Sequence, residues 1–569
     1  MSRPRIAVFS GPTATISNSP PLVTSNQARA RHGLPPLLGP DGEPPRYDVL
    51  RPQRLAAPVT VYIQAHTAHP LEADASELYA PPDGWLDGAG AFVATEPDGG
   101  GTPVYVAELR PEDGPVPLPY MARQADGSAW EDATSAPFAP ALLSRQTFYP
   151  DASRIYEEID RLGIGGDGRP VELSGLADFD FFRPAPSGGY TKGLAAGDRP
   201  DVGEGDVPPE LLGEDYFVYY PHHLSREPTL AVLARATNVV QSVLATGRYA
   251  GAQWLEGSPS NEETMYWLGL VIDTAVPLVG HSAQRPHQTL SADGDRNIVD
   301  GVKYIASGVA LDDHGRNRMG AVMIVDELVF TAREITKTDA RPGGYEAAGG
   351  HGGIVADMGG YGAPQVTFVP SRRHTHCSEV RLPVLPSAVF GVAGSLADGV
   401  RAVEVDTKCA AGELLPEAMP VVTLTKYSRY APHLTSAADD ADPAGEVEVL
   451  ARIDANLRSS PLAGFVEEGM SPYGSSNPTT DAALTVGIFA GMPVVRVGRG
   501  NTGGMAYRSS PLFISGNNLT APKARMLLMA ALLKFGALPP AADPFHPTAD
   551  ERAATEKAVA AYQQVFDTH

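Results

Sequence analysis

The sequence predicts an α/β protein with a larger, doubly wound domain built on a parallel sheet and a smaller α/β domain after it. From about residue 215, segments with helical periodicity alternate with β-branched apolar runs, as in sheets covered by helices on both faces. After a glycine-dense segment, a second and shorter series of apolar strands and helices follows. Residues from about 31 to 213 instead combine short alternating runs with Pro, Gly and acidic residues, which indicates an irregular β-rich insertion. We therefore expect one domain over residues 1–378 and another over 379–569.

The first predicted element is a buried strand at residues 6–9, an apolar run close to the N-terminus. Inside the insertion, alternating runs at 59–65, 90–96 and 103–109 predict short strands. The insertion offers no comparable partner for the first strand, so we expect that strand to begin the larger domain.

The larger domain continues with alternating helices and strands. Apolar spacing predicts helices over 229–245, 261–272 and 297–307 and strands over 276–282 and 321–330. Ser260 precedes the second of these helices and, with Glu263 three residues later, predicts a capping box.

The smaller domain repeats this alternation. Its predicted strands are 388–394, 420–428 and 492–499, and its last helices are 520–535 and 549–566. Thr520 is the expected N-cap of the first of these two helices, with Pro522 in the first turn.

Charge and composition exclude several classes of protein. The 569 residues include 44 Lys and Arg against 67 Asp and Glu, a formal net charge of −23 that disfavours binding to nucleic acid or anionic membranes. Only Cys377 and Cys409 are present, so a disulfide framework is excluded. No apolar run approaches the roughly 18 residues of a membrane span. We expect a cytoplasmic protein without nucleic-acid or membrane partners.

Three segments combine a hydroxyl or a lysine with a turn. The loop SGPTATIS after the first strand contains Thr13 and Thr15, and such loops border the ligand cleft of open α/β sheets. The segment LEGSPSNEET places Ser258 in a turn, where a hydroxyl alternatively bonds only the local backbone. The segment REITKTD places Lys337 just past a strand. A lysine there acts as a base only if it is desolvated beside a hydroxyl.

Taken in order, these segments resemble the bacterial-type asparaginase/glutaminase family. Family members read TGGTI, THGTDTMEET, GAMRP, SADGPxNLxxAV and DxTKT where this chain has PTATI, LEGSPSNEET, SAQRP, SADGDRNIVDGV and EITKT. The stretch ISGNNLTAPKARMLLMAAL also resembles the family's closing SGTLNPQKARVLLQLAL. The resemblance covers the first 26 or so residues and most of the chain after residue 215, and implies a two-domain asparaginase-like fold with amidohydrolase activity.

The resemblance also implies roles for individual residues. Thr15 occupies the position of the nucleophile, with Thr13 as the alternative if SGPT is aligned on TGGT. Ser258 occupies the position of the second-loop threonine and Lys337 that of the lysine, so the two would relay the proton. Backbone N–H groups near Gly257 and Ala283 would stabilise the oxyanion.

Departures from the family pattern bear on the substrate. Glu256 replaces a histidine, which would place an acid beside the turn, and Pro259 replaces the second-loop aspartate. The segment FVYYPHHLSREP lacks the family's Ser and Asp that bind an amino-acid head group. We therefore expect hydrolysis of a carboxamide other than asparagine, or of a cyclic or N-substituted amide.

The expected enzyme needs neither a metal nor a cofactor. The motif HTHC at residues 374–377 has ligand chemistry but lacks a fourth ligand, which favours structural or surface residues over zinc. The partner of the expected enzyme would be a small-molecule amide. The resemblance to the family also implies a homo-oligomer, either a dimer or a tetramer. The alternatives are an ammonia-supplying subunit of an amidotransferase and a ligand-binding homologue without catalysis.

Overall fold

The computed structural model describes part of the chain. The chain divides into two compact units. The described residues are 3–11, 59–64, 83–87, 92–109, 156, 159, 165, 171, 173–182, 229–285, 291–341, 343–347, 352–359, 363–426, 442–499 and 506–569. The first unit comprises Met1–Pro228, Gln253–Gly257 and Ser282–Val302. The second comprises Thr229–Ala252, Ser258–His281 and Lys303–His569.

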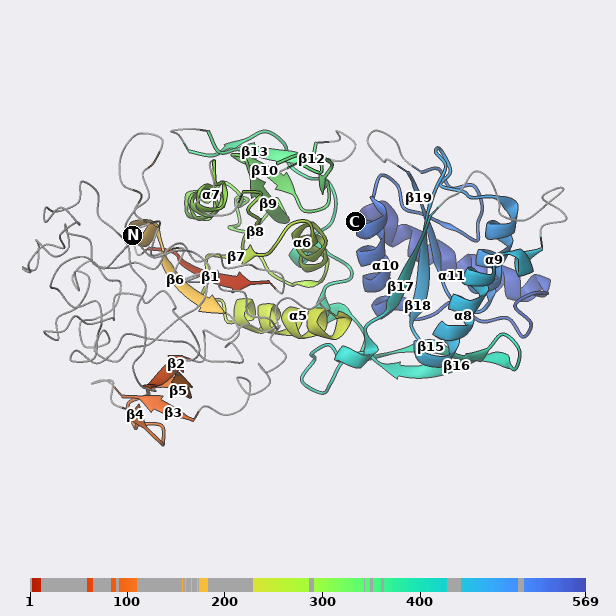
Figure 1. The fold of residues 1–569 in the computed structure, drawn as a ribbon, viewed down its shortest axis with the longest axis horizontal. Coiled ribbons are helices and arrows are strands. Elements are labelled where there is room, and N and C mark those ends of the chain that lie inside the picture. The colour runs from red at the N-terminus through yellow and green to blue at the C-terminus, as the bar shows by residue number, and fades with distance from the viewer. Residues whose placement is uncertain are drawn as a thin grey trace, which may run out of the picture. The chain divides into compact units, whose positions relative to one another are not determined.

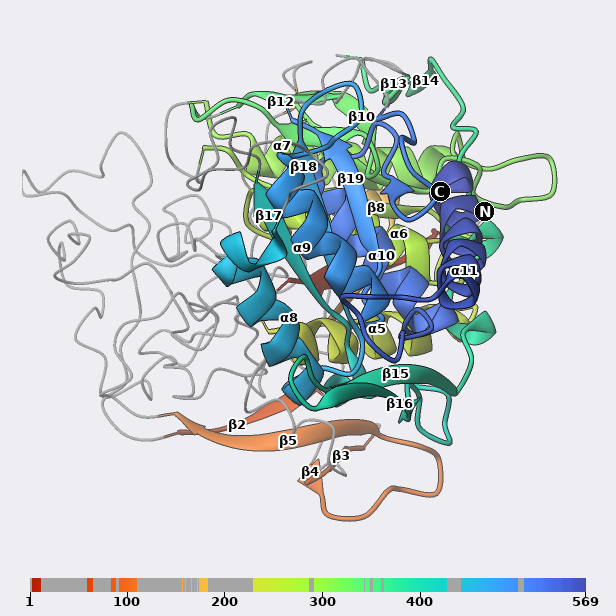
Figure 2. The same ribbon diagram turned by 90° about the vertical axis from the view of Figure 1, so that its right-hand side faces the viewer.

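The predicted α/β class is confirmed. The largest sheet has eight strands in the order β14-β13-β10-β9-β8-β7-β1-β6, and a second sheet has the order β17-β18-β19-β20. All three pairings of the second sheet are parallel. Figures 1 and 2 show the ribbon in two views. The proposed boundary between residues 378 and 379 stays a prediction.

The first unit begins with the expected buried strand. Its elements, some inside the predicted insertion, are β1 (Arg5–Ser10), β2 (Val59–Gln64), β3 (Gly84–Leu86), β4 (Phe92–Val93), β5 (Thr102–Leu109), α4 (Leu173–Leu176) and β6 (Asp178–Phe182). Strands β2 to β5 form a separate antiparallel sheet. We expected no partner for the first strand inside the insertion. That expectation was wrong, because β6 lies inside the insertion and pairs in parallel with β1. The insertion therefore contributes a strand to the main sheet.

The chain from residue 230 to 366 adds the rest of the main sheet and its helices. These elements are α5 (Leu230–Ala245), β7 (Gly251–Leu255), α6 (Ser260–Val271), β8 (Leu278–His281), α7 (Gly294–Ser307), β9 (Ala321–Val325), β10 (Leu328–Thr331), β11 (Ile335–Lys337), β12 (Tyr345–Ala347), β13 (Ile354–Asp357) and β14 (Gln365–Val366). Strands β7, β8 and β9 are almost entirely buried, which accounts for the continuous apolar sequence of β9. Strands β7 and β8 each also bury one polar side chain, Gln253 and His281.

The main sheet contains the predicted parallel strands and also antiparallel ones that the sequence did not predict. Strands β8 and β9 pair in parallel, but β9 turns directly into β10, which runs antiparallel to it. The two residues at this turn, Asp326 and Glu327, both have positive φ, as a two-residue hairpin turn requires. A single apolar run therefore folds as two strands, because this turn interrupts it.

Helix α6 does not begin with the predicted capping box. Its N-cap is Pro259, which makes no side-chain capping bond, and Ser260 is the first helical residue. Because Ser260 already has helical geometry, it does not occupy the position from which a capping side chain reaches the N3 amide.

The C-terminal part of the second unit is a parallel sheet with helices on both faces. Its elements are η6 (Thr375–Cys377), η7 (Leu382–Val384), β15 (Ala388–Ser395), β16 (Gly399–Asp406), η8 (Pro416–Ala418), β17 (Val421–Lys426), η10 (Pro443–Gly445), α8 (Val447–Ser459), β18 (Ala463–Gly469), α9 (Pro478–Phe489), β19 (Val494–Gly498), β20 (Ile514–Ser515), α10 (Ala521–Phe535) and α11 (Ala549–Thr568). Helix α10 packs on β17 and β18, and α8 and α9 lie on the opposite side of the sheet (Figure 1). Thr520 is the N-cap of α10, as expected.

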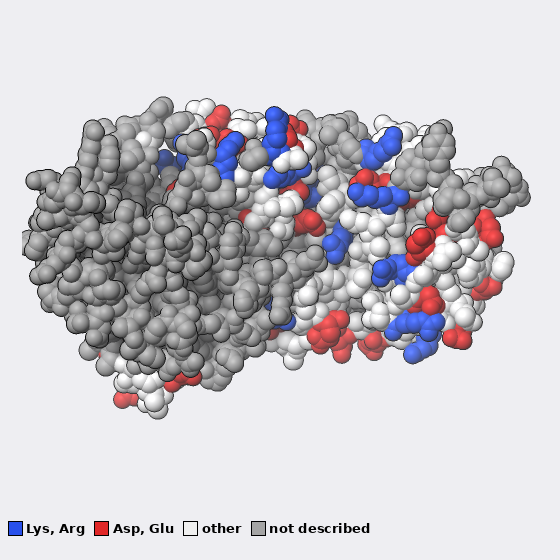
Figure 3. All heavy atoms as spheres, viewed as in Figure 1, with Lys and Arg blue, Asp and Glu red and all other residues white. Residues whose placement is uncertain are grey.

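The surface of the described residues carries charges of both signs. On the face drawn in Figure 3, Lys and Arg side chains are interspersed with Asp and Glu. Among the described residues, no helix is both long and apolar enough to cross a membrane.

Candidate functional site

In the first unit, Glu256 lies against the start of the first loop. Its carboxylate accepts a hydrogen bond from Trp254 Nε1 at 2.8 Å, and the residue is only 4% exposed. A Cβ added at Gly11 would lie 2.8 to 2.9 Å from the Cβ, Cγ and Cδ atoms of Glu256. Gly11 stands two residues before Thr13 and four before Thr15 in the sequence. Both threonines lie outside the described residues.

A bond between two loops of the same unit brings Gly257 and Ala283 near each other. The Ser282 hydroxyl donates to the backbone carbonyl of Glu256 at 3.0 Å. Because Gly257 and Ala283 each follow one of the bonded residues, their backbone groups lie at the junction of the loops. This arrangement suits the expected pair of backbone donors.

The SADGDRN motif holds the loop that contains Ala283. The Asp293 carboxylate accepts hydrogen bonds from the backbone N–H groups of Gln284 at 2.9 Å and Arg285 at 2.8 Å. The Asn297 side-chain amide donates to the carbonyl of Ser282 at 2.9 Å. These motif residues therefore act on the geometry of the loop.

In the second unit, a tyrosine connects Ser258 to the strand that carries Lys337. The Tyr345 hydroxyl donates a hydrogen bond to Ser258 Oγ at 2.7 Å. Strands β11 and β12 are antiparallel, and their register places Lys337 directly opposite Tyr345. Directly opposed side chains project from the same face of a sheet, with Cβ atoms about 4.5 to 5.5 Å apart. The structure thus brings the Ser258 and Lys337 segments to one place.

Local hydrogen bonds fix the position of Lys337. Its backbone N–H donates to Glu262 Oε2 at 3.0 Å, which ties the end of β11 to α6. The hairpin closes when Thr338 N donates to the carbonyl of Gly344 at 2.9 Å. Gly344 has φ +75°, and a Cβ there would lie 2.3 Å from the Cβ of Asp339. This turn therefore requires glycine.

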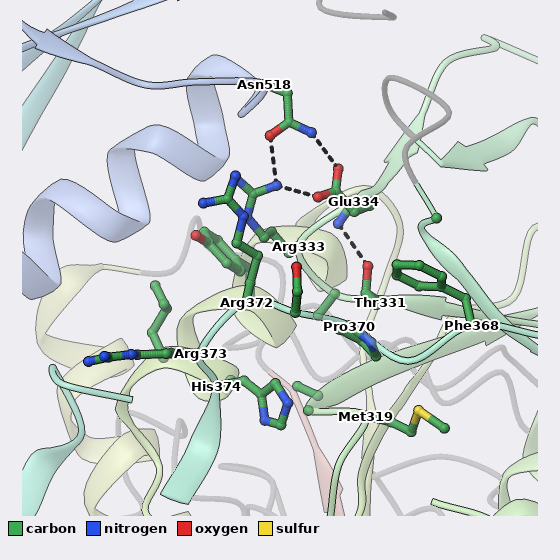
Figure 4. Close-up of a pocket in the computed structure, with 18 residues that line it drawn as sticks. Met319, Thr331, Arg333, Glu334, Phe368, Pro370, Arg372, Arg373, His374 and Asn518 are labelled. Atoms are coloured by element: carbon green, nitrogen blue, oxygen red, sulfur yellow. Dashed lines mark hydrogen bonds and ion pairs between the residues drawn. The ribbon is translucent and has the colours of Figure 1, made fainter. Parts of the chain in front are cut away.

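A polar network anchors the residues that precede β11 (Figure 4). Asn518 accepts from Arg333 Nη1 at 2.8 Å and donates to Glu334 at 3.0 Å, and Arg333 also pairs with Glu334. Lys523 of α10 donates to the carbonyl of Ala332. Burial lowers the pKa of Lys523 to about 8, although nearby glutamates oppose this shift. The network links α10 to the strand of Lys337.

A cavity of about 240 Å³ lies beside this network. Figure 4 shows residues that line it. It is lined by residues such as Thr331, Phe368 and His374, and by none of Ser258, Lys337 or Tyr345. Burial lowers the pKa of His374 to about 4, so this imidazole is neutral at pH 7. Within the described ranges, no group of three or more His, Cys, Asp or Glu residues is arranged to hold a metal ion.

His281, at the end of β8, is not a charged group of the site. Burial lowers its pKa to about 3, so its imidazole is uncharged at pH 7. Its backbone carbonyl accepts a hydrogen bond from the side-chain amide of Asn261 at 2.7 Å, within the second unit.

The sequence did not single out Tyr345. A signal was present, since RPGGYEA places a glycine pair between two short segments and such pairs favour hairpins. That signal predicts a hairpin but not its register, because the loop between the paired residues Lys337 and Tyr345 spans residues 338–344. The predicted head-group segment FVYYPHHLSREP, residues 217–228, lies outside the described residues.

Known proteins match parts of this chain. Residues 207–343 match the family described as Asparaginase, N-terminal. A glutaminase-asparaginase of Acinetobacter glutaminasificans is 35% identical over 81 residues, 14% of this chain and 23% of that protein. L-asparaginase 2 of Escherichia coli (strain K12) is 35% identical over 83 residues, 15% of this chain and 22% of that protein.

These alignments are partial. The chain spans about a quarter of the length of the curated relatives that it matches. A solved structure of a probable cytoplasmic L-asparaginase from Campylobacter jejuni aligns with TM-score 0.41 and 19% identity, covering 60% of this chain and 81% of that one. The sequence matches support the resemblance, and they make residues 207–343 similar to the N-terminal region of asparaginases.

Proposed function

We propose that this chain is an amidohydrolase that cleaves a carboxamide other than asparagine, or a cyclic or N-substituted amide. Its relatives are named as asparaginases or glutaminase-asparaginases, which supports hydrolysis of a C–N bond other than a peptide bond. The observation that carries the proposal is the convergence of Ser258 with the strand of Lys337 through Tyr345. A serine hydroxyl and a lysine on adjoining segments are suited to moving a proton.

In the proposed reaction, the Thr15 hydroxyl, or Thr13 in its place, attacks the amide carbonyl. Its proton passes through Ser258 and Lys337 to the leaving nitrogen, which departs as ammonia or an amine. Water then cleaves the acyl ester and releases the carboxylic acid. Backbone donors at Gly257 and Ala283 would stabilise the oxyanion.

The substrate is proposed from two departures in the sequence. Pro259 replaces an aspartate, and FVYYPHHLSREP lacks the Ser and Asp expected to hold an amino-acid head group. L-Asparagine and L-glutamine should therefore be poor substrates beside neutral, cyclic or N-substituted amides. Ammonia or amine release from such a panel tests this, and efficient turnover of asparagine would contradict it.

The relay is tested with Lys337→Met and Ser258→Ala. Each should lower kcat about 100-fold to 10,000-fold, and the double variant should lose little more, because residues of one catalytic unit are not additive. Lys303→Met, at an exposed position of α7, is the matched control and should keep full activity. Near wild-type turnover by Lys337→Met would refute the relay.

Two other results would change the proposal. If no amide in the panel releases ammonia or amine while a ligand binds, the chain is a binding homologue. If ammonia release requires a co-purified protein or RNA, the chain is an amidotransferase subunit. The proposal also includes a homo-oligomer, either a dimer or a tetramer, which light scattering would measure.

A further inference from the structure

We propose that the hydroxyl of Tyr345 is a positioning group for Ser258 and substitutes for the carboxylate that Pro259 lacks. The inference deepens the proposed function and rests on it. A serine in a relay must present its single proton in one direction, and a neighbouring polar group has to set that direction. Pro259 has no side chain that can do so.

The direction of the bond between Tyr345 and Ser258 determines where the serine proton points. Tyr345 donates to Ser258 Oγ at 2.7 Å, so the serine oxygen is the acceptor in this contact. The serine's own proton must then point away from Tyr345, toward another acceptor. A hydroxyl that accepts a hydrogen bond is also polarised and donates more strongly, because such bonds reinforce one another.

The surroundings of Tyr345 suit this role. The residue is 8% exposed, so water competes little for the Ser258 contact. Its strand partner is Lys337, whose side chain leaves the same face of the β11–β12 pair. The tyrosine can therefore fix the serine oxygen while Lys337, acting as a neutral amine, accepts the serine proton.

The test is Tyr345→Phe, which removes the hydroxyl and keeps the ring. We expect kcat on the best amide to fall about tenfold, with KM within about twofold, as for loss of one oriented hydrogen bond. In a Ser258→Ala background, the same change should cost nothing further. Tyr304→Phe is the matched control, because Tyr304 is also buried and its hydroxyl has no hydrogen-bond partner among the described residues.

A second measurement separates this inference from the proposed function. An arylsulfonyl fluoride forms a sulfonate ester with an activated serine and releases fluoride, and mass spectrometry follows this reaction at Ser258 without any amide substrate. Labelling of Ser258 should be about tenfold slower in Tyr345→Phe than in wild type or Tyr304→Phe. If the wild type cleaves no amide, the proposed function fails, while labelling still tests Tyr345.

Two results would overturn the positioning role. One is an unchanged or faster labelling rate in Tyr345→Phe. The other is a loss of kcat that persists at full size in the Ser258→Ala background, which would show that the tyrosine does not act through Ser258. A thermal midpoint close to that of wild type would confirm that Tyr345→Phe remains folded.

Discussion

Gly11 lets the backbone at the start of the first loop pass against Glu256, so Gly11→Ala should be costly. The added Cβ would lie 2.8 Å from Cβ and 2.9 Å from Cγ and Cδ of Glu256. Comfortable carbon contacts are about 3.5 to 4.0 Å. Glu256 cannot simply move away, because it is 4% exposed and bonded to Trp254 at 2.8 Å. Overpacking of this kind typically costs about 1 to 3 kcal/mol.

The assay is urea unfolding followed by tryptophan fluorescence, since Trp254 is fully buried and bonded to Glu256. At a slope of about 2 to 3 kcal/mol per M, this cost should lower the urea midpoint of unfolding by roughly 0.3 to 1.5 M. Gly99→Ala is the control, because a Cβ at Gly99 meets nothing within 4 Å, and it should change stability by less than about 0.5 kcal/mol.

A double-mutant cycle identifies the clash. In a Glu256→Gly background all three contacted carbons are absent, so Gly11→Ala should cost little. In a Glu256→Ala background the Cβ contact at 2.8 Å remains, and the cost should be intermediate. An equal cost of Gly11→Ala in all three backgrounds, or no cost in the wild type, would refute this placement of Glu256.

Three further predictions concern pH, the Ala283 loop and metals. The pKa values of His281, about 3, and His374, about 4, lie below the unfolded value of about 6.5, so the unfolded chain binds more protons between these limits. The contribution of these two histidines to the free energy of unfolding should be fully present above pH 6.5. It should fall as the pH drops toward 4, by about 1.4 kcal/mol per pH unit for each histidine. The thermal midpoint of His374→Gln should decline less steeply over this pH range than that of the wild type. Asp293→Ala leaves two backbone N–H groups without their acceptor and should lower the free energy of unfolding by about 1 to 3 kcal/mol. Hydrogen exchange at the amides of Gln284 and Arg285 should become faster. Unchanged exchange there would contradict the role given to Asp293 in holding this loop. Prolonged chelation should leave amide hydrolysis intact, and loss of activity with recovery on adding zinc would contradict the proposed chemistry.

Local elements followed closely from the residue pattern. Apolar runs marked β1, β8 and β9, and helical spacing marked α5, α6 and α10, because burial of one face imposes a period that the sequence itself displays. Boundary details were less accurate, as at Ser260, where capping depends on a backbone angle that the residue type does not determine.

The sequence by itself determined the α/β class, the asparaginase-like motifs and the identity of Ser258 and Lys337 as candidates, since these depend on residue type and spacing. Only the tertiary structure decided which segments meet. The pairing of β1 with β6 joins residues more than 170 positions apart, and the bond from Tyr345 to Ser258 spans 87 positions. Such contacts depend on how strands and turns pack together, and short-range periodicity carries no information about them.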